Sequence, residues 1–355
     1  MKKLRWLFPC ILLASACSKD DKKPSDPVVG VATGVYVLSE GTNNDSKLAF
    51  YDLNSKQVTG DFFLQQNPTI TAGLGQYAND MLIYGSKLYI VVNASGTLVV
   101  ADAANAKVIK TLELSKDHPG KLPRFVIPYK NKVYVSAWDN TVNAIDTSSL
   151  TLTKSIPVGP TPEGMAIVGS TLYVANSGGF NTEPDSTVSV VNLNTETETM
   201  KITIGTINPQ KIAVNSLGDV YVSGYGVYGG VPPSVSVIQS STNTVKKELG
   251  AAFPFSHVRI YKDVAFFYNN YGGTEVLLYN TTNNTVIRES FVTDGTAVEA
   301  VYGVNIDEEN DNVYITDSKN FASSGAVFCF GSDGKKKFDF STSPGVGPNT
   351  VVFKR

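Results

Sequence analysis

Cysteine, histidine and tryptophan are scarce in this sequence of 355 residues. It contains three cysteines, two histidines and two tryptophans, and 17% of its residues are charged. Cys10 and Cys17 lie close to the start, so Cys329 has no partner in the rest of the chain and is expected to be a buried thiol. The sequence has no paired histidines for a metal, no Gly-x-Ser-x-Gly motif and no cysteine placed as a nucleophile. We therefore expect that the protein is not an enzyme, that it has no catalytic residue and no metal site, and that it requires no cofactor.

A long hydrophobic run is also missing. Residues 6–13 are apolar but too few to span a bilayer, and they follow the basic residues Lys2, Lys3 and Arg5. This order is typical of a secretory signal peptide, which we place at residues 1–16. Its removal leaves 27 basic and 32 acidic residues, a net charge of −5, with no basic run in the domain. Nucleic acid is therefore not an expected partner.

The end of this signal resembles the lipobox of bacterial lipoproteins. Small residues lead to Cys17, although Ala14 stands where that family usually has Leu. The resemblance implies that Cys17 is lipidated and that the membrane is reached through this anchor only. The Ser-Lys-Asp-Asp sequence at 18–21 resembles the signal that sends lipoproteins to the cell exterior. Residues 17–33 contain two prolines and no helical pattern, so we expect a flexible tether there.

One short pattern, an aromatic residue between apolar residues, recurs along the rest of the chain. The aromatic residues lie 53, 45, 39, 48, 45 and 48 residues apart. This spacing is the length of a four-stranded propeller blade. The seven copies are Val35-Tyr36-Val37, Leu88-Tyr89-Ile90, Val133-Tyr134-Val135, Leu172-Tyr173-Val174, Val220-Tyr221-Val222, Ala265-Phe266-Phe267 and Val313-Tyr314-Ile315. We predict an all-β, seven-bladed β-propeller of four-stranded antiparallel blades over residues 34–355.

Two further features refine this fold. No stretch has a sustained 3.6-residue apolar period, so we expect almost no helix. If the strands of each blade are counted from the propeller axis outward, the domain opens on a second strand and ends on a first, inner strand at 350–353. The C-terminal strand should therefore complete the first blade from the inside. A short polar residue precedes a tight turn in five of the repeats. These residues are Asp52, Asp102, Asp146, Asn192 and Asn280.

Aromatic residues gather in the connections on one face of the predicted propeller. Aromatic rings offer stacking area, and Asn and backbone groups offer directed hydrogen bonds, so this face suits a large, ring-containing, partly polar ligand. Packing of the loops against each other is the structural alternative. The loop candidates are Trp138, Phe180, Tyr225, Tyr228, Tyr268, Tyr271 and Phe321. At the channel mouth, the starts of the inner strands should add Asn79, Arg124, Lys211, His257, Tyr302 and Asn349, together with Glu163.

The repeats and the start of the chain resemble two known groups. The segment TLYVANSGG…STVSVVNLNTETETMKITIG, with TPEGMAI before it, is similar to YncE-type seven-bladed propellers. With the lipobox-like start, the chain resembles BtuG-type surface lipoproteins. That resemblance implies an outer-membrane protein facing the cell exterior. It would bind cobalamin or another corrinoid and pass it to a TonB-dependent transporter (BtuB-like).

Three other functions stay open at this point. A glycan-binding surface protein would also use aromatic platforms, and a protein-interaction module would use the same loops against a partner. A propeller enzyme such as a lactonase usually holds a metal in a ring of Glu, Asn and Asp at the channel mouth. Here that ring would contain Arg124, Lys211 and His257, which argues against a cation.

Overall fold

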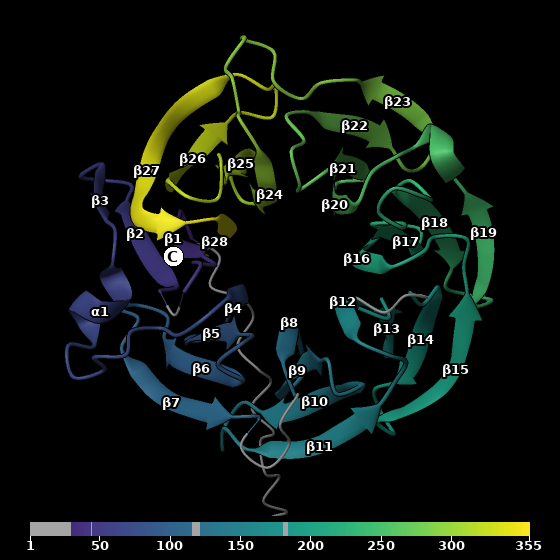
Figure 1. Ribbon diagram of the computed structural model, residues 1–355, viewed down its shortest axis with the longest axis horizontal. Helices are drawn as coiled ribbons and strands as arrows, with labels where there is room; N and C mark the ends of the chain where they lie inside the picture. The colour runs from purple at the N-terminus through teal and green to yellow at the C-terminus, as the bar shows by residue number, and fades with distance from the viewer. Residues whose placement is uncertain (1–29, 44, 116–120, 180–183) are drawn as a thin grey trace, which may run out of the picture.

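Seven antiparallel sheets stand around a central axis in the computed structural model (Figure 1). The structure describes residues 30–43, 45–115, 121–179 and 184–355. Each sheet has four strands, and the helices in these residues are only α1 (Phe62–Gln66) and the 3-10 helix η1 (Gly250–Ala252). The predicted seven-bladed propeller with almost no helix is therefore confirmed.

The strands of each blade are hydrogen-bonded in order from the axis outward. The inner strands are β28 (Pro348–Lys354), β4 (Ala78–Tyr84), β8 (Pro123–Tyr129), β12 (Pro162–Val168), β16 (Pro209–Val214), β20 (His257–Tyr261) and β24 (Val301–Asp307). The second strands are β1 (Gly34–Ser39), β5 (Lys87–Val92), β9 (Lys132–Ala137), β13 (Thr171–Asn176), β17 (Asp219–Gly224), β21 (Val264–Tyr268) and β25 (Asn312–Asp317). The third strands are β2 (Lys47–Asp52), β6 (Thr97–Asp102), β10 (Thr141–Asp146), β14 (Thr187–Asn192), β18 (Ser234–Gln239), β22 (Val276–Asn280) and β26 (Ser324–Phe330). The outer strands are β3 (Gln57–Thr59), β7 (Val108–Glu113), β11 (Leu152–Pro157), β15 (Thr197–Thr203), β19 (Thr244–Glu248), β23 (Thr285–Arg288) and β27 (Lys336–Val346).

Burial falls from the second strand of each blade to the outer strand. Every residue of β1 is buried, because this strand has hydrogen-bonded neighbours on both sides and packed blades on both faces. Every residue of β19 is exposed, and its sequence TVKKE includes two lysines and a glutamate. Charged side chains on such an outer strand oppose pairing with another sheet edge. Cys329 of β26 is buried, as expected, and burial raises its pKa to about 11.

The C-terminal strand closes the ring. β28 pairs antiparallel with β1, and Val351 lies opposite Val37 in this register. The first blade is thus built from both ends of the propeller, as the sequence predicts (Figure 1). This pairing covers the inner edge of β1, which would otherwise leave unpaired backbone groups.

The repeated tyrosine of the second strand links neighbouring blades. Its ring is buried, and in four blades its hydroxyl reaches the turn between the third and outer strands of the next blade. The four bonds are Tyr36 to the Ala103 carbonyl (3.1 Å), Tyr134 to Glu196 (2.9 Å), Tyr173 to Asn243 (2.6 Å) and Tyr221 to the Thr281 carbonyl (3.2 Å). These partners are 60 to 70 residues apart in the sequence. Each bond gives a buried hydroxyl its partner and fixes two blades against each other.

The turns that receive these tyrosines have the predicted polar residue. The Asp52 carboxylate accepts from the backbone N–H groups of Asn54 (2.9 Å) and Ser55 (2.8 Å). Lys56 then takes a positive φ of 58° and closes the turn. The same side-chain bonds form at the four other positions, which are Asp102, Asp146, Asn192 and Asn280. The predicted tight turns are therefore confirmed.

We predict that Tyr173→Phe lowers the free energy of unfolding by about 1 kcal/mol, because it removes the bond to Asn243 and leaves that amide oxygen without this donor. Urea denaturation measures the change. Tyr89→Phe is the matched control, since the Tyr89 hydroxyl is buried and has no hydrogen bond in the part of the chain described. That variant should change stability by less than about 0.5 kcal/mol or increase it. Equal losses in the two variants would contradict the role of the inter-blade bond.

Candidate functional site

A cavity of about 1620 Å³ occupies the centre of the ring. Its wall consists of the seven inner strands, and its mouth is formed by loops that follow the second strands. Tyr271 and the loop around Tyr228 belong to this mouth, while Val214 and Ile306 line the far end. Ligand pockets usually measure about 300–1,000 Å³, so this space is large even for a bulky small molecule.

A β-bulge near the start of the inner strand aims one side chain into the cavity in six of the seven blades. Bulges redirect side chains in this way because the extra residue breaks the regular alternation. The first residue of each bulge lines the cavity, and these residues are Asn79, Arg124, Glu163, Gln210, Tyr302 and Asn349. Five of them are residues that the sequence analysis placed at the mouth.

Lys211 and His257 lie one residue deeper than this ring, although both also line the cavity. Both occupy the same position in their blades as Asp80. Each of the three lies opposite the residue that stands two places after the repeated aromatic residue of the neighbouring second strand. The loop between β16 and β17 is longer than the loop between β4 and β5. Gln210 therefore lies 11 residues before Tyr221, whereas Asn79 lies 10 residues before Tyr89, and the strand start predicted from the sequence was Lys211 in place of Gln210.

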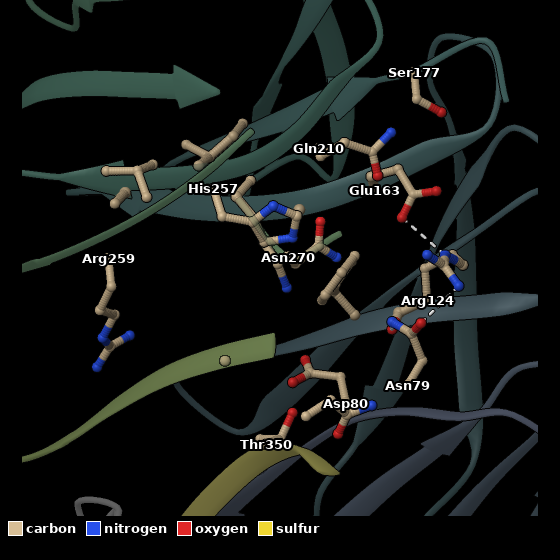
Figure 2. A pocket seen from close by; sticks show the side chains of 18 of the residues that line it. Asn79, Asp80, Arg124, Glu163, Ser177, Gln210, His257, Arg259, Asn270 and Thr350 are labelled. Carbon is tan, nitrogen blue, oxygen red and sulfur yellow. Dashed lines mark hydrogen bonds and ion pairs between the residues drawn. The ribbon is translucent and has the colours of Figure 1, made fainter. Parts of the chain in front are cut away.

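One side of the mouth is a network centred on Glu163. Its carboxylate accepts from Arg124 Nε at 2.8 Å and from Trp138 Nε1 at 2.9 Å. Arg124 also donates to the side-chain oxygen of Asn79 at 2.6 Å, and its guanidinium lies 4.9 Å from the centre of the Trp138 ring. Figure 2 shows Arg124 between Glu163 and Asn79, with both bonds drawn. The network holds a flat indole and guanidinium pair in one orientation at the rim.

The opposite side of the mouth is an arc of aromatic rings from three neighbouring blades. Tyr225 lies 5.6 Å from Tyr271, and Tyr271 lies 6.4 Å from Tyr302 and 6.1 Å from Phe321. The side chain of Asn270 donates to the Tyr225 hydroxyl at 3.0 Å. Tyr271 is 67% exposed, so its face is available at the centre of the arc.

Glu40 joins this arc to the first blade. Its carboxylate accepts a hydrogen bond from the Tyr302 hydroxyl across the seam between the last and first blades. Burial raises the pKa of Glu40, and the bond from Tyr302 opposes part of that rise. Sequence reasoning did not single out Glu40, since a lone glutamate in a polar loop gives no signal of its partner.

The deeper ring contains ionisable groups in an environment poor in water. Burial raises the pKa of Asp80 to about 6, although the nearby Lys211 opposes the rise. Burial also lowers the pKa of Lys211 to about 8, and the pKa of His257 falls well below its usual range for the same reason. The imidazole is therefore neutral at neutral pH. Figure 2 shows Asp80, Arg124 and His257 directed toward the same region of the cavity.

The remaining predicted residues fall into three groups. Tyr268 is 5% exposed and packs in the core between two blades, against His257 at 5.2 Å, so it supports the wall. Tyr228 stands fully in solvent at the mouth, and the Asn349 amide donates to the Ala78 carbonyl at 2.9 Å. Phe180 and Cys17 lie outside the described residues.

Two further findings concern metal binding and membrane-spanning helices. In the described residues, no group of three or more His, Cys, Asp and Glu side chains has an arrangement that could hold a metal ion. No helix in that part of the chain is both long enough and apolar enough to cross a membrane.

Comparison with known proteins gives a family. A family model described as a domain of unknown function (DUF5074) matches residues 33–342. The chain belongs to the DUF5074 family. None of the curated proteins matches this DUF5074 chain in sequence.

Solved structures similar to this DUF5074 protein support its fold. A quinonprotein alcohol dehydrogenase-like protein from Bacteroides thetaiotaomicron matches with a TM-score of 0.68 and 14% identity, covering 91% of this chain and 79% of that chain. Kuenenia stuttgartiensis hydrazine synthase matches with a TM-score of 0.57 and 18% identity, covering 71% of this chain and 76% of that chain. At such low identity the likeness concerns the fold alone.

We predict that Glu163→Ala lowers the free energy of unfolding by about 3 kcal/mol, because the side chain is buried and its loss leaves Arg124 without its carboxylate. Thermal and urea denaturation measure this. Glu308→Ala is the matched control, since its ion pair with Arg259 is exposed at both ends. That change should cost less than about 1 kcal/mol. Similar losses in both variants would mean that the Glu163 network does not hold the mouth.

Proposed function

We propose that this DUF5074 protein captures cobalamin or a related corrinoid at the mouth of its central cavity, without chemical change to the ligand. The observation that carries the proposal is the pair of walls around one wide opening. An arc of tyrosine and phenylalanine rings forms one wall, and the Trp138 and Arg124 stack forms the other. Flat apolar surface on two sides suits a large ligand that has both a macrocycle and an aromatic group.

Polar groups between these walls support the same ligand class. Corrinoids carry many primary amides around the ring, and amides need both donors and acceptors. Gln210 and Asn270 line the cavity, and their side-chain amides contain both kinds of group. A cavity of about 1620 Å³ exceeds what a single sugar or amino acid needs, which favours a bulky ligand.

The cellular role follows from the sequence resemblance. We propose that Cys17 is lipidated and anchors the protein to the outer membrane, with the propeller facing the cell exterior. The loop face would then present the captured corrinoid to a TonB-dependent transporter (BtuB-like). The support for this step is the lipobox-like start and the tether at 17–33, both of which are sequence features.

We further propose that the protein is not an enzyme and needs no cofactor. The cavity wall presents Arg124 and Lys211 where a metal-dependent propeller enzyme would place acidic ligands. The aromatic arc would equally suit a glycan, and the loops could meet a partner protein. Both remain outcomes of the binding test.

Calorimetric titration of the purified chain with cyanocobalamin tests the proposal. We expect one-to-one binding, weakened about tenfold or more by Tyr271→Ala, because loss of a central aromatic contact costs at least about 1.4 kcal/mol. Tyr271 is 67% exposed, so its removal should leave the fold intact. Tyr261→Ala is the control, since Tyr261 ends β20 at the other face of the ring.

Two results of the same titration would contradict the proposal. Absence of heat at micromolar protein would reject corrinoid capture and leave glycans and partner proteins to be screened against the same variants. Binding that is unaffected by Tyr271→Ala but weakened by Tyr261→Ala would place the ligand on the other face.

A further inference from the structure

Most charged side chains of the cavity already have a partner. Asp80 accepts from the backbone N–H of Val126 at 3.0 Å. Arg124 forms an ion pair with Glu163 at 2.8 Å, and Arg259 forms one with Glu308 at 3.3 Å. The Glu40 carboxylate accepts a hydrogen bond from the Tyr302 hydroxyl. These groups are satisfied within the protein and have less to gain from a ligand.

Lys211 is different. Its ammonium lies 3.7 Å from the centre of the Phe125 ring, and in the described part of the chain it has neither an ion pair nor a hydrogen bond. A ring face stabilises a cation only partly, and an ammonium has three N–H donors. Burial lowers the pKa of Lys211 to about 8, which reflects this incomplete compensation. The ammonium therefore feels the charges of Asp80 and Glu163 but touches no carboxylate in the described residues.

His257 can complete an anion site beside Lys211. It occupies the same register in the next inner strand and interacts electrostatically with Lys211. Its Nδ1 lies 3.1 Å from the Ser256 hydroxyl. When that hydroxyl donates to Nδ1, the neutral ring carries its proton on Nε2 and can donate to an anion.

Asp80 limits the charge that such a site accepts. It stands in the same ring on the other side of the cavity, and it interacts electrostatically with Lys211. A carboxylate there repels an anion, and the cost of taking an ion out of water rises with the square of its charge, so a singly charged group suits the site better than a doubly charged one.

We infer that Lys211 and His257 form a subsite for one singly charged oxyanion group, and that it receives the phosphodiester of the captured ligand. This rests on the proposed function, because the phosphodiester is taken to belong to a complete corrinoid. The aromatic mouth then holds the macrocycle, while the deeper ring selects ligands that carry the anionic tail.

The charges around the subsite predict how binding depends on pH. The groups that face Lys211 are Asp80 from β4, Arg124 from β8, Glu163 from β12, and His257 and Arg259 from β20. Lys211 is charged below its pKa of about 8, so anion affinity should fall as pH rises through that value. Asp80 is neutral below its pKa of about 6, so affinity should rise again as pH falls through that value.

The test is calorimetric titration of the full chain with cyanocobalamin and with cobinamide, which lacks the whole nucleotide loop, including its phosphodiester. Lys211→Met should weaken cyanocobalamin binding about tenfold or more, because it removes a charge-assisted bond, and should leave cobinamide binding unchanged. Asp80→Asn should strengthen cyanocobalamin binding at pH 7, because it removes a carboxylate that repels the anion. The fold should be kept, since the amide oxygen can still accept from the backbone N–H of Val126. A gain in affinity cannot come from misfolding. Lys262→Met is the control, because Lys262 is exposed and paired with Asp311 at 2.7 Å.

The other outcomes separate the anion subsite from corrinoid capture. Equal weakening of both corrinoids by Lys211→Met, or no weakening of either, would overturn the anion subsite and leave corrinoid capture standing. If the wild-type chain binds neither corrinoid, the proposed function fails, and titration with dimethyl phosphate tests the subsite alone. Dimethyl phosphate binding that Lys211→Met abolishes would retain the anion site, and absence of binding would reject it.

Discussion

The buried tyrosine of the second strand is the contact on which the propeller depends. Its ring fills the interface of its own blade, and its hydroxyl reaches the outer turn of the next blade, as Tyr36, Tyr134, Tyr173 and Tyr221 do. Seven similar interfaces must close one ring, so an error in any of them would accumulate around the circle. Pairing of β28 with β1 completes the circle and makes the inner strands a wall with set spacing.

That wall is what makes a site possible. The inner strands bring seven separate stretches of sequence to one axis, and the bulges at their starts aim polar side chains inward. Hydrogen bonds such as those of Glu163 to Arg124 and Trp138 then hold these side chains in place before any ligand arrives. A preorganised mouth loses less entropy on binding than one formed by mobile loops.

Much of the site could be predicted from repeat position. Asn79, Arg124 and Tyr302 were expected at the mouth because they begin inner strands, and the structure aligns them in one ring. Repeat position could not separate Tyr268 from Tyr271. Tyr268 is the last residue of β21 and packs between blades, whereas Tyr271 lies in the loop that follows and is exposed.

The sequence by itself determined the number of blades, the strand order, the tight polar turns and the closure by the C-terminal strand. These follow from local patterns, because each blade is one repeat with its own apolar period and turn residues. Only the tertiary structure decided the bulge register, the Glu163 network and the position of Lys211 over the Phe125 ring. Those features depend on contacts between blades, such as Tyr302 with Glu40 across 262 residues, and no local pattern records which side chains meet across a ring.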